Sequence, residues 1–264
     1  AQCVMDLFVG FAAIVSRRFE MVKQWRWLSA HPEELLAHAH RVGLSPAAPL
    51  LRGLSYVCYD RGQIKRALRL ALESLAGRGG LDDIVDRSSL TCLQKIANML
   101  NKLQHRGFAE ALLRRATRVL ASTFGERDRD TLSAMTDLAN VLADRRKSEE
   151  ARDIYKKTLA GLRETLGPSD PETLICLIGL GSVHHDLREY AEAEQILVQA
   201  VRGFETAKAG SEDPDLGGAH AWLGDTLWAQ GKHGEAMPHY QRALDVRLKL
   251  LGANHPETQP SASS

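Results

Sequence analysis

The chain has 264 residues, of which 44% are hydrophobic and 25% charged, enough apolar material for one large or two small globular domains. Its 34 Lys and Arg residues balance 33 Asp and Glu residues, which leaves a formal net charge of +1. So small a net charge creates no overall field that would attract nucleic acid or an acidic membrane. We therefore expect neither as a partner.

Cysteine spacing argues against metal and redox chemistry. Since no two of the four cysteines form a C-x-x-C pair, we predict no metal site and no cofactor. Together with the absence of an Asn-x-Ser/Thr sequon, this suits a reducing compartment, so the expected location is cytoplasmic. The apolar run from Leu7 to Val15 is too short to cross a bilayer and has no basic leader. The cysteines are Cys3, Cys58, Cys92 and Cys176.

Residues 1–44 are predicted to form an N-terminal helical segment that packs on the rest of the chain. Two helices are expected there, one around Asp6 to Trp27 and one after Pro32, with Trp25 and Trp27 covering the end of a stack. Because the first residue is Ala1 and not Met, we expect the sequence to be an excised fragment.

From residue 45 onward the sequence repeats itself. Apolar anchors recur every 42 or 43 residues, a small residue follows each anchor, and an alanine stands thirteen positions after it. This self-similarity predicts five repeats, at about 45–86, 87–128, 129–170, 171–213 and 214–256, and a disordered tail at 257–264. The anchors are Leu54, Ile96, Leu138, Leu180 and Leu223; the small residues are Ser55, Ala97, Ala139, Gly181 and Gly224; the alanines are Ala67, Ala109, Ala151, Ala193 and Ala236.

Each repeat is predicted to be a pair of helices. Apolar residues recur at helical spacing twice per repeat, and Gly62 and Gly231 mark the turn between the two helices. Between repeats, "LGPSDPETL" offers Asp170 as a helix cap and Pro171 for the first helical position. A single helix pair cannot bury its apolar face, so the pairs are expected to stack into an all-α solenoid of antiparallel helix pairs.

These features resemble the tetratricopeptide repeat family. The 42-residue period, the linker "LGPSDPETL" and the phrase "EAMPHYQRAL" are similar to the kinesin light chain subtype. The resemblance implies a right-handed superhelix and covers about residues 45–256. The first two repeats depart from it, since Ala71 stands where Tyr155 and Tyr240 stand later and "GLDDIVDRSSL" replaces the proline-containing linker. The helical stretch before the repeats is similar to that of larger STAND-class signalling ATPases, so the fragment is expected to come from such an adaptor or signalling protein.

The sequence offers no enzyme signature, and we predict a protein that is not an enzyme. "GDTLWAQGK" has six residues between Gly224 and Gly231 where a phosphate-binding loop has four. Neither an H-E-x-x-H nor a G-x-S-x-G motif occurs.

A binding groove is predicted on the concave surface that the first helices form. Residues two positions after each anchor point away from the buried side, and the stripe extends one turn either way. Side-chain amides there can pair with a peptide backbone, and the resemblance likewise implies recognition of extended peptides by groove asparagines. The alternative is that they are ordinary exposed polar residues. The predicted groove consists of Tyr56, Gln94, Asn98, Asn101, Lys102, Asn140, Asp144, Ser182, His185, Asp225 and Trp228.

The sequence therefore favours a non-catalytic scaffold that binds a protein or peptide ligand. The alternative is a structural or oligomerising module. Self-association is expected through the C-terminal end, because a sixth repeat begins at Asn254 and breaks off. This leaves an apolar strip partly open, of which only some residues can be buried against Leu223 and Leu227: Leu244, Val246, Leu248, Leu250 and Leu251. The natural protein is expected to continue past Ser264 with further repeats. Nucleic-acid binding is disfavoured, since Asp144, Asp186 and Asp225 oppose a basic groove.

Overall fold

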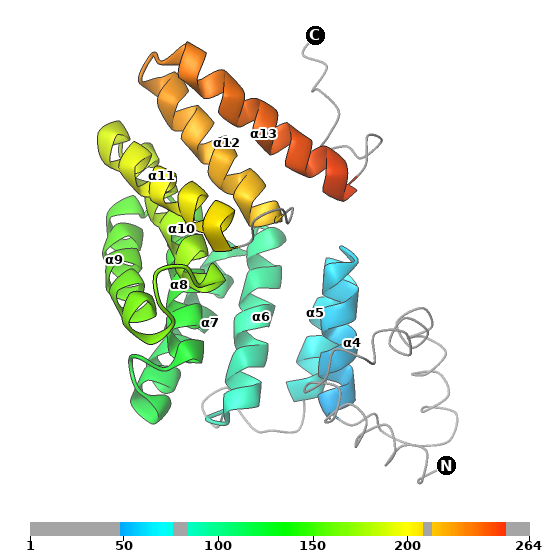
Figure 1. Ribbon diagram of the computed structural model, residues 1–264. Helices are drawn as coiled ribbons and strands as arrows, with labels where there is room; N and C mark the ends of the chain where they lie inside the picture. Colours follow the sequence, from blue (N-terminus) through cyan, green and yellow to red (C-terminus); the bar gives the residue numbers. More distant parts are fainter. Residues whose placement is uncertain (1–47, 76–83, 208–212, 252–264) are drawn as a thin grey trace. The chain divides into compact units, whose positions relative to one another are not determined.

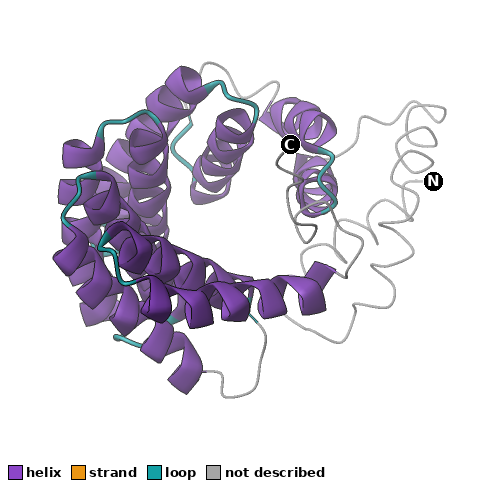
Figure 2. Cartoon of the chain, turned by 90° about the horizontal axis from the view of Figure 1, so that it is seen from above, coloured by secondary structure: helices purple, strands orange, loops and turns teal. Residues whose placement is uncertain are grey.

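A computed structural model describes residues 48–75, 84–207 and 213–251. All the regular structure in these ranges is α-helical, in ten helices without a strand (Figure 2). The all-α prediction is therefore confirmed for the described residues. The chain divides into two compact units, residues 1–112 and 113–264, and each is described by itself.

The first unit contains α4 (Ala48–Asp60), α5 (Ile64–Leu75), α6 (Arg87–Lys102) and the beginning of α7 (Arg106–Phe124). Helices α4 and α5 pack against each other, and α5 also contacts α6. The Ser55 hydroxyl donates a hydrogen bond of 2.8 Å to the Ala67 carbonyl, so the small residue after the first anchor ties the pair together. The core of this unit is built from Leu51, Leu54, Cys58, Ala67, Leu70 and Met99.

The second unit holds the rest of α7 and three further helix pairs (Figure 1). Within each pair the two helices pack side by side, and contacts between α9 and α10 and between α11 and α12 stack one pair on the next. The pairs are α8 (Arg129–Asp144) with α9 (Ser148–Thr165), α10 (Pro171–Asp186) with α11 (Tyr190–Ala207), and α12 (Pro214–Ala229) with α13 (His233–Leu251).

An aspartate caps the first helix of four pairs. The predicted cap at Asp170 is confirmed, because its carboxylate accepts a 2.9 Å hydrogen bond from the Glu172 backbone N–H, with Pro171 at the start of α10. Such caps satisfy backbone donors that have no partner inside the helix. The same role is played by Asp86, Asp128 and Asp213.

The turn between the two helices of every pair has one residue in the left-handed region. Two of these residues are Gly62 and Gly231, with φ of 73° and 80°, which adopt this conformation at little steric cost. Both were predicted to lie in the turn. The other three turns place Gln104, Arg146 and Arg188 there, at φ of 66°, 62° and 64°. The residue after each donates its N–H to a carbonyl five positions earlier, which is the bond of a Schellman cap.

Burial follows the repeat pattern. All five of the predicted alanines are 0% exposed, and all five anchors are between 1% and 5% exposed. Close helix contact explains the small residues, since a Cβ on Gly181 would lie 2.6 Å from Leu197 of α11. The predicted packing of each pair is thus confirmed for the described residues.

Several predictions fall outside the described residues. These are the N-terminal helical segment at 1–44 with Trp25 and Trp27, the tail at 257–264, and the sixth-repeat start at Asn254. The side chains of Leu250 and Leu251 also lie outside them, whereas Val246 of the same predicted strip is buried, at 2% exposed. The repeat limits and the origin in a larger protein stay predictions.

Candidate binding face on α8, α10 and α12

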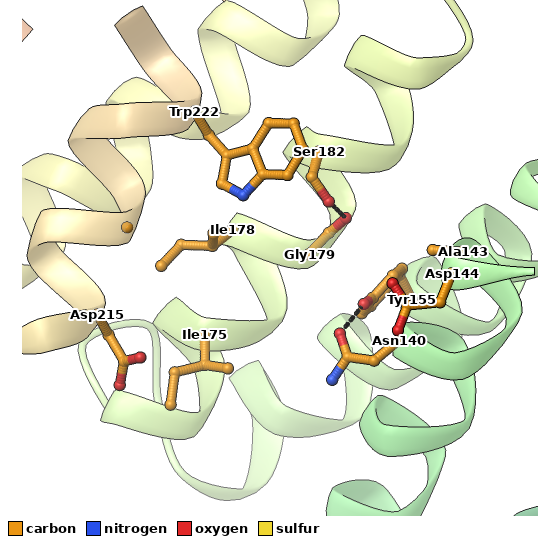
Figure 3. A pocket seen from close by; sticks show the side chains of 11 residues that line it. Asn140, Ala143, Asp144, Tyr155, Ile175, Ile178, Gly179, Ser182, Asp215 and Trp222 are labelled. Atoms are coloured by element: carbon orange, nitrogen blue, oxygen red, sulfur yellow. Dashed lines mark hydrogen bonds between the residues drawn. The ribbon is translucent and has the colours of Figure 1, made fainter. Parts of the chain in front are cut away.

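Three successive first helices of the second unit surround a pocket of about 350 Å³ (Figure 3). Helix α10 forms its floor with Ile175, Ile178, Gly179 and Ser182, and a single residue, Tyr155, reaches it from α9. This volume is in the usual range for ligand sites. The remaining lining residues are Asn140, Ala143 and Asp144 from α8, and Asp215, Gly218 and Trp222 from α12.

A buried tyrosine orients the amide of Asn140. Tyr155 is 1% exposed, and its hydroxyl donates a hydrogen bond to Asn140 Oδ1. Burial, and secondarily the charges of Cys176, Asp137 and Asp144, raise the pKa of Tyr155 well above 10, so the hydroxyl keeps the proton that it donates. With Oδ1 engaged, the two N–H donors of Asn140 are turned away from Tyr155 (Figure 3).

Gly179 leaves the space that the Tyr155 ring occupies. A Cβ at this position of α10 would lie 2.5 Å from the Cζ and hydroxyl oxygen of Tyr155. The ring therefore fits only because α10 has no side chain there, and the same glycine lines the pocket. In this way packing between two helix pairs and the shape of the pocket depend on one residue.

The pocket combines an apolar wall with negative charge. Ile175, Ile178 and Trp222 supply the apolar surface. His185 holds the indole of Trp222 from one side, at 5.7 Å between ring centroids in an edge-on geometry, and its Nδ1 lies 3.2 Å from the Thr226 hydroxyl. The pocket's charged lining residues are the carboxylates Asp144 and Asp215.

Only part of the predicted groove comes together in this pocket. Asn140, Asp144 and Ser182 line it, whereas His185 supports it from outside. Asp225 accepts a 2.8 Å hydrogen bond from the Tyr240 hydroxyl and does not line the pocket. Trp228 is half exposed and packs on His233, with ring centroids 4.2 Å apart.

The predicted groove residues in the first unit are not placed relative to this pocket. Tyr56, Asn98 and Asn101 are partly buried there. Lys102 is exposed and lies over the Tyr59 ring, 4.4 Å from its centroid. Gln94 is 3% exposed, and it stands two positions before its anchor Ile96, as Ile178 does before Leu180, so its place in the groove stays a prediction.

The apolar half of the pocket was not among the predicted groove residues. Ile178 and Ile175 stand two and five positions before the anchor Leu180. Gly218 likewise stands five positions before its anchor, Leu223, in the next repeat. Isoleucines at helical spacing usually indicate core, so the polar pattern of the stripe does not identify them. Ile178 lies within the predicted stripe, and a stripe one helical turn longer that ignores polarity also includes Ile175 and Gly218.

The comparisons with known proteins fit this architecture. A family model described as tetratricopeptide repeat matches residues 88–164 and 130–206, and a second with the same description matches residues 223–257. Together they cover more than half of the sequence, so the chain belongs to the tetratricopeptide repeat family. Among curated proteins, no match is found.

Solved structures show the same fold at low sequence identity. BtubC (BKLC) from P. vanneervenii is 19% identical with a TM-score of 0.62, over 98% of this chain and 97% of its own. A kinesin light chain-like protein of Podosopora anserina with nearly identical TPR-like repeats is 20% identical with a TM-score of 0.62, over 75% and 93% of the two chains. The predicted tetratricopeptide fold is thus confirmed, and the array shares it with kinesin light chain-like repeats.

A third similar structure is a Rap protein complexed with Competence and Sporulation Factor. It is 16% identical with a TM-score of 0.65, over 76% of this chain and 54% of that one.

Within the described ranges, no helix is both long and apolar enough to span a membrane. The same residues contain no group of three or more His, Cys, Asp or Glu side chains that could hold a metal ion.

Proposed function

We propose that the chain is a non-catalytic scaffold that binds an extended segment of a protein or peptide on the face formed by α8, α10 and α12. The observation that carries this proposal is the pocket itself, in which a buried tyrosine holds the amide of Asn140 beside an apolar wall. An oriented amide suits a peptide backbone, and an apolar pocket suits a side chain. The fold shared with a Rap protein solved in a complex is consistent with it.

The test fills the pocket without disturbing the fold. Gly218 lines the pocket, and a Cβ there would meet no atom within 4 Å, so Gly218→Leu occupies the space while keeping the helix. Gly234→Leu is the matched control, because that glycine of α13 is equally open and lies outside the pocket. A random peptide library is displayed and selected on the unmodified chain. Peptides that bind it and the Gly234→Leu variant, but not Gly218→Leu, are expected.

If the selected peptides bind all three proteins equally well, binding does not occur on this face, and the proposal is overturned. Failure to select any peptide from the library would also count against it. Circular dichroism of each variant checks that the helical content is unchanged.

The same proposal includes the setting of the scaffold, a larger adaptor or STAND-type signalling protein in the cytoplasm. The sequence of residues 1–44 supports this setting, because it resembles the helical stretch of STAND-class signalling ATPases. The described cysteines, which form no disulfide, support it as well: Cys58, Cys92 and Cys176. An antibody raised against the chain is expected to detect a cytoplasmic product larger than 29.1 kDa in source cells. A product of that mass, or one outside the cytoplasm, contradicts this part.

A second candidate function, self-association, is favoured by apolar side chains on α13. Met237 is 59% exposed and Leu244 is 38% exposed, seven positions apart and hence on one side of the helix. Exposed apolar surface of this kind favours a partner. Light scattering against concentration is expected to show dimers that Leu244→Lys abolishes; a monomer at all concentrations rules this candidate out.

A further inference from the structure

The pocket on α8, α10 and α12 carries negative charge that the chain as a whole does not have. Its charged lining residues are Asp144 and Asp215, and no Lys, Arg or His of the described residues lines it. The complete sequence, in contrast, is balanced at a net charge of +1. The local charge is therefore a property of this site and not of the composition.

We infer that this pocket selects a long cationic side chain, Lys or Arg, of the bound segment, which rests on the function proposed above. The stem of such a side chain would lie on Ile175 and Ile178, and its charged end would meet the carboxylates. Lys and Arg bury their methylene groups along apolar surface while the charged group stays near water or an anion. A pocket with both surfaces fits such a side chain better than a purely apolar or an acidic one.

Trp222 strengthens the preference for a cation. A cation within about 6 Å of an indole face is attracted by the ring electrons, and tryptophan is the best aromatic for this contact. His185 packs edge-on against this indole, which restricts its rotation. Trp222 and Asp215 both come from α12, so they approach the pocket together (Figure 3).

The two carboxylates approach from different helices. Asp144 ends α8, and Asp215 lies in the first turn of α12. In Figure 3 they lie on opposite sides of the view, with Ile175 and Ile178 between them. A cationic group in the pocket therefore meets negative charge from both sides, whereas a carboxylate of the ligand would be repelled by both.

The experiment compares five peptide pools that share degenerate flanking positions and differ at one fixed central residue: Arg, Lys, Met, Gln or Glu. Binding to the complete chain is measured by fluorescence anisotropy at low and at moderate salt. We expect the Arg or Lys pool to bind at least about tenfold more tightly than the Met and Gln pools, and the Glu pool to bind most weakly, with the preference reduced by salt.

Three variants identify the source of the preference. Asp144→Asn and Asp215→Asn keep the shape and remove one charge each, so each is expected to lower the preference for Arg or Lys over Gln several-fold. Asp186→Asn is the matched control, because this carboxylate of α10 lies outside the pocket, 3.8 Å from Arg146. It is expected to leave the preference unchanged.

The outcomes separate this inference from the function on which it rests. Binding that Gly218→Leu abolishes, but that is as tight for the Met, Gln or Glu pool as for Arg and Lys, overturns the inference and leaves the proposed function standing. The same holds if Asp186→Asn changes the preference as much as Asp144→Asn and Asp215→Asn do. Binding of no pool, or binding that Gly218→Leu does not affect, overturns both.

Discussion

The third and the fifth helix pair, α8–α9 and α12–α13, follow one plan but differ in how their tyrosines are packed. Tyr155 and Tyr240 occupy the same repeat position, and each hydroxyl donates to the side chain fifteen positions earlier, Asn140 or Asp225. Tyr155 is 1% exposed, whereas Tyr240 is partly exposed. The same sequence signal thus has two environments.

The difference comes from the next helix pair. The Tyr155 ring is covered by α10 at Gly179, while Tyr240 lies against Gly224 of its own pair, where a Cβ would be 2.8 Å from the ring. No described helix follows α13 to cover Tyr240. A repeat residue therefore gains most of its packing from the neighbouring repeat, as expected of an array whose stability is the sum of pairs and their interfaces.

The largest effect that this comparison predicts is at Gly179. In Gly179→Ala the new methyl group meets a buried ring whose hydroxyl is bonded, so we expect a loss of about 2–3 kcal/mol in the free energy of unfolding. In Gly224→Ala the ring of Tyr240 can turn toward solvent, and the better helix propensity of alanine offsets most of the cost. Urea unfolding followed by circular dichroism measures both.

Equal losses in the two glycine variants would show that coverage by the next pair does not explain the difference. Gly218→Ala is a further control, since its Cβ meets open space and the change should stabilise α12 slightly.

A second difference makes the fifth pair sensitive to acid. His220 and His239 stand where the third pair has Met135 and Ile154, and their Nδ1 atoms are 2.9 Å apart. Burial of His220, together with the charges of His239 and Arg242, lowers its pKa from 6.5 to about 4. Burial also lowers the pKa of His239, against the opposing effect of Glu205.

Because the folded-state pKa of His220 is lowered, the unfolded chain takes up a proton between pH 6.5 and 4 that the folded chain does not bind. The free energy of unfolding therefore has its full value above pH 6.5 and decreases as the pH falls toward 4. For the lowered pKa of His220 the loss is about 2 kcal/mol at pH 5. The double variant His220→Met with His239→Ile, which copies the third pair, is expected to remove this part of the pH dependence. Thermal melts from pH 8 to 4.5 that are parallel for both proteins would contradict it.

The hydroxyl groups of Tyr155 and Tyr240 should also differ in how much they contribute to the free energy of unfolding. Tyr155→Phe removes the donor that orients Asn140, and we expect a cost of about 1 kcal/mol together with weaker peptide binding. Tyr240→Phe should cost less than about 0.5 kcal/mol, because water replaces the hydroxyl on the exposed Asp225. Paired unfolding and anisotropy measurements test this; unchanged binding in Tyr155→Phe would show that the orientation of Asn140 has no role.

Periodicity was enough to predict the helix pairs, because anchors such as Leu138 and alanines such as Ala151 meet the same packing demand in every repeat. It could not predict the contact between Tyr155 and Gly179, since that depends on which residue of the next pair lies over the ring. The exposed amide of Asn140 was predicted, but not the hydrogen bond that fixes it. The apolar wall was missed because Ile178 and Trp222 have a polarity typical of core residues while they line a pocket.

The smallest predicted effect concerns the turns inside the two pairs. Arg146 adopts a φ of 62° in the third pair, where the fifth pair has Gly231 at 80°. A side chain in the left-handed region costs about 1 kcal/mol, and glycine avoids most of this cost while losing more conformational entropy on folding. The ion pair that Arg146 makes with Asp186 is long, at 3.8 Å, and the arginine side chain is 84% exposed, so its loss should matter little. We therefore expect Arg146→Gly to stabilise the chain by a few tenths of a kcal/mol, up to about 1 kcal/mol, and Gly231→Ala to destabilise it by a similar amount. Urea midpoints that moved in the same direction for both variants would show that the backbone conformation of this turn does not determine its contribution.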